Sequence, residues 1–192
     1  PLKGENKKAI KMGIDNAKRA LAKKISEFNS HSNLLKSLAN LLKISSNLNR
    51  IEIYDNSHFN GANMMGVMVV SSNLGFEKNQ YRKFNLKNNI RVFKGNDDYG
   101  MIEEVFYRRF KKLTNNSEHI SPDLIIIDGG KGQVNIACNV INSLEIRDVI
   151  VIGVSKGKDR NAGREKIHFS DIKQYIPELI QNSKQLNPLI LD

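Results

Sequence analysis

A buried strand that ends in a carboxylate is the feature that constrains this chain most. The aliphatic residues 124–127 follow soon after Pro122, and Asp128 and a glycine-rich stretch, residues 129–133, come directly after them. A short aliphatic run bounded by proline and glycine is typical of a strand covered on both faces. Ligands bind outside the carboxyl ends of such strands. Asp128 is therefore either a site carboxylate or the cap of the following helix, and this motif alone does not decide between the two.

The composition points to a soluble protein with a polyanionic partner. Its 192 residues carry 30 Lys and Arg against 20 Asp and Glu, a formal net charge of +10. Nucleic acid is the leading candidate for the partner, and an anionic membrane surface is the alternative. No apolar run approaches the roughly 18 residues that span a bilayer, and the chain does not open on a signal peptide. We therefore expect a cytoplasmic protein without membrane association.

The single cysteine, Cys138, lies in a helix-like segment with no His or Asp partner at motif spacing. A lone cysteine of this kind is typical of a small core residue, so we exclude disulfides and a zinc site.

The first 48 residues are expected to form two amphipathic helices. Apolar residues recur at steps of three and four through residues 7–28 and again through residues 32–43, the period of a helix with one buried side. The apolar stripe of the first helix consists of Ile10, Ile14, Ala17, Leu21, Ile25 and Phe28. Seven cations on its outer face suit a phosphate backbone or, equally, a solvated surface.

The polar stretch 45–49 indicates a linker. We therefore divide the chain into an N-terminal helical segment (1–48), a main domain (49–170) and a divergent or truncated tail (171–192).

The main domain is expected to be α/β, with a mixed sheet and helices on its faces. Three strand patterns come first, at residues 50–54, 64–70 and 80–86, and short connections between them favour antiparallel pairing. A helix then begins at Asn96 or Asp97 and reaches about residue 113. The Asp128 strand, a helix over residues 133–144 and a strand over residues 148–154 follow. This order predicts three antiparallel strands with parallel additions.

Two carboxylates are expected to meet at one edge of this sheet. Asp55 ends the first predicted strand just as Asp128 ends the fourth. Carboxylate oxygens select Mg²⁺ or Mn²⁺, and two such ions about 4 Å apart can activate a water and stabilise the leaving oxygen of a phosphodiester. The pair Asp97 and Asp98 completes the set if the helix between the strands turns back toward the sheet; otherwise the pair is only an N-cap. We expect His58 to orient a loop or a carboxylate nearby.

Basic residues are expected beside this acidic edge. A glycine-interrupted basic loop, residues 156–164, follows the last predicted strand and suits contacts to a DNA backbone that carry no sequence information; the alternative is a solvated loop. The candidates for phosphate contact are Lys131, Lys156, Lys158, Arg160 and Arg164. The glycine stretch before Gln133 lacks the spacing and the Ser or Thr of a phosphate-binding loop, so a nucleotide triphosphatase is excluded.

These blocks, in this order and spacing, resemble the C-terminal half of the UvrC family, the incising subunit of the bacterial nucleotide excision repair excinuclease. The resemblance lies in residues 4–7, 15–17, 51–52, 55–58, 81–84, 97–99, 108–109, 123–133 and 153–165. It implies an RNase H-like endonuclease domain that makes the 5′ incision beside a lesion in double-stranded DNA, with Mg²⁺ or Mn²⁺ as the cofactor and the UvrB–DNA complex as the partner. Carried over by position, the catalytic, metal-binding aspartates are Asp55, Asp98 and Asp128, and Asp97 becomes the helix cap.

The resemblance has clear departures. It fades after Phe169, and the family's later histidine, within a segment resembling Asp-Glu-x-His-Arg-Phe, and its tandem helix-hairpin-helix region are not found in this sequence. The family's N-terminal GIY-YIG nuclease and UvrB-binding segment are also outside it. Two readings therefore stay open: a catalytic module, or a truncated remnant that binds DNA weakly through its charge. A DNA-binding module that never cuts would not explain three acidic positions.

Overall fold

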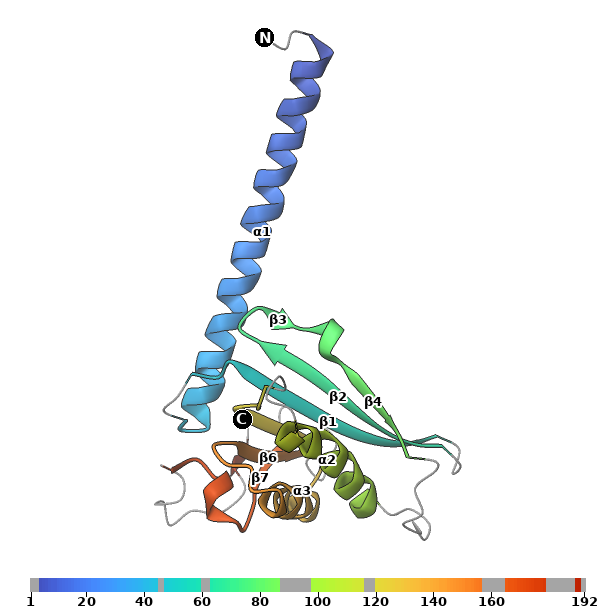
Figure 1. Cartoon of the computed structure of the whole chain (residues 1–192). Helices are drawn as coiled ribbons and strands as arrows, with labels where there is room; N and C mark the ends of the chain where they lie inside the picture. The colour runs from blue at the N-terminus through green and yellow to red at the C-terminus, as the bar shows by residue number, and fades with distance from the viewer. Residues whose placement is uncertain are drawn as a thin grey trace.

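The computed structural model describes residues 4–44, 47–59, 63–86, 98–115, 120–156, 165–178 and 189–190. The helices are α1 (Glu5–Leu41), α2 (Asp98–Asn115) and α3 (Lys131–Ser143), with short 3-10 turns η1 (Lys78–Gln80) and η2 (Lys173–Tyr175). The strands are β1 (Arg50–Phe59), β2 (Asn63–Ser72), β3 (Gly75–Phe76), β4 (Arg82–Asn85), β5 (Leu124–Asp128), β6 (Ile150–Ser155), β7 (Lys166–Phe169) and β8 (Leu189–Ile190). α2 and α3 lie on one face of the sheet, and α1 rises from the other (Figure 1).

One mixed sheet of eight strands forms the centre of the described chain, in the order β3-β2-β1-β5-β6-β7-β8 with β4 beside β2. β1, β5 and β6 run parallel, whereas β2 pairs antiparallel with both β1 and β4, and β7 pairs antiparallel with β6. The predicted mixed α/β sheet is confirmed, including the three antiparallel strands β1, β2 and β4. β5 lies in the middle, and its residues Leu124, Ile125 and Ile127 are fully buried.

Two apolar cores lie on opposite faces of the sheet because residues alternate along each strand. Tyr54, Ile125 and Val151 face α2 and α3 and pack with their apolar sides. Ile51, Leu124 and Ile152 face the other way, toward the C-terminal end of α1. Cys138 is a free, buried thiol within the first core, as the sequence predicts.

The prediction that β1 ends at Tyr54 is wrong. β1 continues to Phe59 because its hairpin with β2 continues, through pairs from Asp55 with Val67 to Phe59 with Asn63. Only the parallel pairing with β5 ends near Tyr54. β4 is likewise shorter than residues 80–86, since Gln80 belongs to the turn η1.

α1 differs most from the prediction. The two expected helices form one continuous helix, because the polar residues 29–31 between their apolar stripes contain no proline or glycine that would end a helix. Its C-terminal end is anchored: Leu35, Ala39 and Leu42 are buried in the second core, and the His31 Nε2 and Ser71 Oγ atoms lie 3.1 Å apart.

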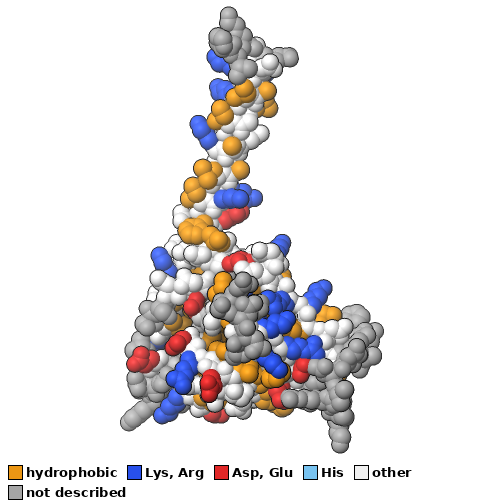
Figure 2. All heavy atoms as spheres, viewed as in Figure 1, with side chains coloured by type: hydrophobic (Ala, Val, Ile, Leu, Met, Phe, Trp, Pro, Cys, Tyr) orange, Lys and Arg blue, Asp and Glu red, His pale blue; other side chains and the backbone are white. Residues whose placement is uncertain are grey.

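The rest of α1 projects from the body of the protein, so its apolar stripe is not covered (Figures 1 and 2). The large stripe residues, expected to be buried, are 40–60% exposed: Ile10, Ile14, Leu21, Ile25 and Phe28. Within the described ranges, no helix combines the length and apolar character needed to cross a bilayer.

Candidate active site

Asp55 and Asp128 lie side by side at the edge where the parallel pairing of the two central strands ends. β1 and β5 pair in parallel through Ile51 with Leu124 up to Tyr54 with Ile127. Asp55 and Asp128 are the next residue of each strand, and both are exposed. Since neighbouring strands lie about 4.8 Å apart, the structure brings together the two carboxylates that the sequence expects to meet.

Both aspartates project from the face of the sheet that α1 contacts. Ile51 and Leu124 lie in the core on that face, and Ile53 and Ile126 pack against it. Alternation along the strands places the aspartates two residues further on the same face. On β1 and β5 the apolar core thus ends where the carboxylates begin, whereas Val154 of β6, the partner of Asp128, still packs against it.

Asp98 is the first residue of α2 and approaches the same edge from the other face. The rings of Phe106 and Tyr54 lie 4.7 Å apart, and Arg109 bonds to Glu52, so α2 runs antiparallel to β1. Its N-terminus therefore points toward the edge at which Asp55 lies.

The start of α2 also contacts the start of α3, because a Cβ atom at Gly132 would lie 2.6 Å from the Tyr99 hydroxyl. α2 therefore turns back toward the sheet, which is the condition for Asp98 to join the two strand carboxylates. Across the described ranges, however, no group of three or more His, Cys, Asp or Glu residues is placed to hold a metal ion. The structure thus pairs Asp55 with Asp128 and does not gather Asp98 into a three-carboxylate cluster.

The cap of α3 resolves one alternative for Asp128. The N-cap residue is Gly130, and its backbone N–H donates to Oε1 of Gln133 at 3.0 Å. The helix begins at Lys131, two residues earlier than predicted. Asp128 is therefore not the cap of this helix, and its carboxylate faces solvent.

The predicted phosphate contacts fall in different places. Lys156 is exposed and directly follows β6, at the same edge as Asp128. Lys131 forms an exposed ion pair with Asp171, with Nζ 2.7 Å from Oδ1. The hydrogen bonds from Lys131 and Asn135 lower the pKa of Asp171.

Several predicted residues lie outside the part of the chain that the structure describes. They are Asp97, Lys158, Arg160 and Arg164. The backbone of His58 lies within β1 rather than in a loop, and its side chain is outside the described part.

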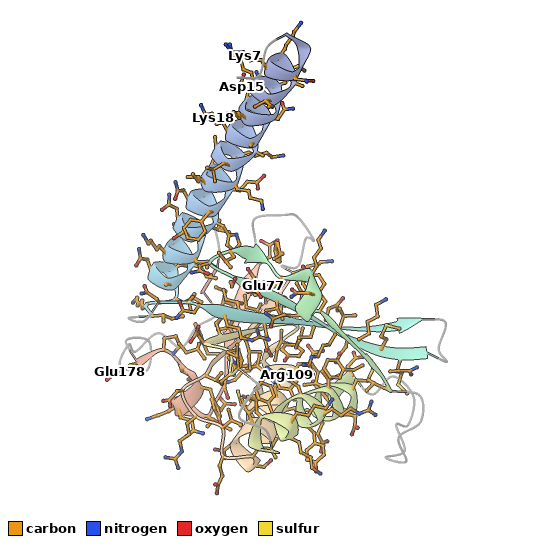
Figure 3. The ribbon with its side chains drawn as sticks, turned by 45° about the horizontal axis from the view of Figure 1, so that its top comes forward. Lys7, Asp15, Lys18, Glu77, Arg109 and Glu178 are labelled. Carbon is orange, nitrogen blue, oxygen red and sulfur yellow. The ribbon has the colours of Figure 1, made fainter. Side chains whose placement is uncertain are left out.

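A buried charged network supports the site, and no role was predicted for its members from the sequence. The Glu52 carboxylate is fully buried and accepts hydrogen bonds from Arg109 Nη2 at 2.6 Å, Arg109 Nε at 3.1 Å, Arg50 Nε at 2.9 Å and the Tyr54 hydroxyl at 2.6 Å. Arg109 lies between the sheet and α2 (Figure 3). The available signal was Glu52 itself, a charged residue among the aliphatic residues of a predicted strand, because a buried charge needs a partner.

The network shifts the pKa values of its members. Burial raises the pKa of Tyr54 well above its usual value, and the negative charge of Glu52 raises it further. Burial alone would lower the pKa of Arg109, but its hydrogen bonds to Glu52 and the charge of Glu52 outweigh this effect and raise it. Arg109 therefore stays a cation and Tyr54 a neutral hydrogen-bond donor.

The family model and the relatives that match this chain agree on one family. Residues 39–190 match the family model of the UvrC RNase H endonuclease domain. The UvrABC system protein C of Zymomonas mobilis subsp. mobilis is 42% identical over 179 residues, which is 91% of this chain and 27% of that protein. The UvrABC system protein C of Nitrobacter winogradskyi is 42% identical over 183 residues, which is 89% of this chain and 26% of that protein. The chain thus spans about a quarter of the length of these relatives.

Among solved structures, Ciona intestinalis endonuclease V in complex with DNA aligns with a TM-score of 0.43 and 17% sequence identity, over 70% of this chain and 58% of that chain.

Proposed function

Since this chain belongs to the UvrC RNase H endonuclease domain family, we propose that it is a nuclease module of nucleotide excision repair that makes the 5′ incision beside a DNA lesion. The observation that carries this proposal is the pair Asp55 and Asp128, exposed and adjacent at the edge where the parallel pairing of β1 and β5 ends. This edge is the usual place for a site in an open α/β sheet.

The donor atoms at this edge fit Mg²⁺ or Mn²⁺. Hard divalent cations take oxygen ligands, and the neighbouring carboxylates of Asp55 and Asp128 supply them. Asp98, at the start of α2, would complete the set. When bound, such an ion activates water and neutralises the charge that develops on a phosphate.

The protein's own residues hold and orient the site. Asp55 and Asp128 keep their spacing because the sheet fixes both strands. The buried bonds between Glu52 and Arg109 fix α2, which begins at Asp98, against β1. Like charges on neighbouring strands repel each other, and a bound cation would relieve that repulsion. The pair therefore favours a divalent cation.

We propose damaged double-stranded DNA as the substrate, presented as a complex with UvrB. The net charge of +10 favours a polyanion. Lys156, beside Asp128, suits a backbone phosphate, and Lys131, Lys158, Arg160 and Arg164 are proposed to add further contacts. Such contacts carry no sequence information, as expected of a nuclease that acts wherever a lesion occurs.

A second candidate is a non-catalytic module that binds DNA weakly through its basic charge. One observation favours it: among the described residues, Asp98 does not join the other two carboxylates in a metal-holding group. The two candidates make different predictions for metal binding and for incision.

Calorimetric titration with Mn²⁺ separates them. We expect the wild-type chain to bind Mn²⁺ and Asp128→Asn to lose that binding while keeping its circular dichroism spectrum. Asp148→Asn is the matched control, because Asp148 is an exposed aspartate just before β6, at the opposite edge of the sheet, and Asn tolerates its positive φ of 59°. Equal Mn²⁺ binding by wild type and Asp128→Asn would contradict the metal site.

An incision assay then tests the reaction itself. A lesion-containing duplex is incubated with the chain, Mn²⁺ and the damage-recognition partners. We expect cleavage on the 5′ side of the lesion by the wild type and none by Asp128→Asn. Mn²⁺ binding without any cleavage would favour the non-catalytic module.

A further inference from the structure

A row of residues crosses the sheet at the level of the two aspartates. Lys83 of β4 pairs with Val67 of β2, and Val67 pairs with Asp55 of β1. Asp55 lies beside Asp128 of β5, which pairs with Val154 of β6. These five residues therefore form one line perpendicular to the strands, with Lys83 at one end and the carboxylates in the middle.

Lys83 and the aspartates project from the same face of the sheet. Residues paired directly across neighbouring strands share a face, so Lys83 shares the face of Asp55. The neighbours of Lys83 support this assignment. Phe84 is buried in the core beneath α2, and Arg82 pairs with Met68, which lies in that same core. Lys83 is exposed.

The distance along the row suits a nucleic-acid backbone. At about 4.8 Å per strand, the backbone of Lys83 lies about 10 Å from Asp55. Phosphates of one strand of a duplex advance about 3.4 Å per nucleotide along the axis and also wind around it, so neighbouring phosphates lie roughly 6–7 Å apart and this span corresponds to about one or two nucleotides. The side chain of Lys83 is therefore placed to meet a phosphate close to one held at the carboxylates.

The charges along this part of the sheet also suit a backbone. Carboxylates repel a phosphate unless cations on either side attract its neighbours. Lys83 lies on the β4 side of the aspartate pair, and the exposed Lys156 follows β6 on the other side. A strand that crosses the sheet along the row would meet a cation before and after the carboxylates.

We propose that a DNA strand crosses the sheet along this row and that Lys83 is a positioning residue, which binds a backbone phosphate about one or two nucleotides from the phosphate at Asp55 and Asp128. The inference rests on the proposed nuclease function and adds the path of the substrate. Because the contact is to phosphate, it applies to DNA of any sequence.

Two neighbouring substitutions test the path. Lys83→Gln and Arg82→Gln each remove one positive charge from β4, one on each face of the sheet, so their long-range electrostatic effects match. The full chain is titrated into a fluorescein-labelled DNA duplex at several KCl concentrations without divalent metal. We expect Lys83→Gln to weaken binding about two- to fivefold and to make the negative slope of log K against log [KCl] shallower by about 0.9. Arg82→Gln should retain the wild-type slope, and Lys83→Arg should restore it.

Equal slopes for Lys83→Gln and Arg82→Gln would overturn the inference, and so would a wild-type chain that does not bind the duplex. In the incision assay, Lys83→Gln should raise KM and leave kcat unchanged, and its Mn²⁺ titration should match that of the wild type. If the wild type binds DNA but never cuts it, the proposed incision fails while the slopes still decide the role of Lys83.

Discussion

Arg109 reaches from α2 to Glu52 of β1, and both side chains are almost completely buried, with 2% and 0% of their surface exposed. The strand of this pair carries Asp55 and the helix begins at Asp98. The pair therefore links the two elements that supply the proposed site. A buried ion pair of this kind is a weak source of net stability, but removal of one partner leaves a buried charge uncompensated.

We expect Glu52→Ala to lower the free energy of unfolding by about 3–5 kcal/mol, because Arg109 would keep its charge without a carboxylate. Urea denaturation followed by circular dichroism measures this loss. Glu52→Gln retains the shape and two polar atoms and should cost less. A loss below about 1 kcal/mol for Glu52→Ala, the range of exposed pairs, would show that the network is solvated.

The sequence predicted the parts of this molecule that depend on periodicity and order. The aliphatic run before Asp128 predicted a central buried strand, and the order of elements predicted a mixed sheet. From these two points followed the meeting of Asp55 and Asp128. Each of these steps depends on local pattern and on general rules of strand connection.

Other features depend on tertiary contacts that no local pattern contains. The charge of Glu52 was visible, but its partner Arg109 lies 57 residues away in the chain. The length of β1 is set by its hairpin with β2, not by its own composition. The period of α1 predicted a helix correctly but could not reveal that most of its apolar stripe has no covering element in the described chain.

The two halves of α1 should respond differently to the same substitution. Leu42, at its anchored end, is fully buried, and Leu42→Ala should cost about 2–5 kcal/mol through lost burial and a cavity. Leu21, on the projecting part, is 60% exposed, and Leu21→Ala should change stability by at most about 0.5 kcal/mol. Thermal or urea unfolding of the two variants tests this. Similar losses would mean that the stripe is covered in solution.

Gly153 should not tolerate a side chain. It is buried in β6, and a Cβ atom there would lie 2.6 Å from the carbonyl oxygen of Gly129 and 2.5 Å from Cγ2 of Val134. Gly153→Ala should therefore cost about 1–3 kcal/mol through overpacking. Gly13→Ala is the control, because nothing lies within 4 Å of a Cβ atom at Gly13 and alanine favours a helix. Equal unfolding midpoints for the two variants would contradict the close approach of β6 to Gly129.

Cys138 should make the protein less stable at alkaline pH. Burial raises the pKa of its thiol from 9.0 to about 12, against a weaker opposite effect of its hydrogen bond with Ser170. The folded state thus holds the proton more tightly than the unfolded state. The protonated thiol therefore adds to the free energy of unfolding. This stabilisation is fully present below pH 9.0, and it is lost as the pH rises toward about 12. Each pH unit between the two values should remove about 1.4 kcal/mol from the free energy of unfolding.

Urea unfolding at pH 8 and pH 10 measures this loss. The measurement stops at pH 10, because an unfolded tyrosine has a pKa of about 10 and the pKa of the buried Tyr54 is raised. Above that pH, tyrosine ionisation would also lower the stability of the folded state. Cys138→Ala removes the thiol and should show a smaller loss of stability between the two pH values than the wild type. An equal loss in both proteins would mean that Cys138 ionises as easily in the folded state as in the unfolded state.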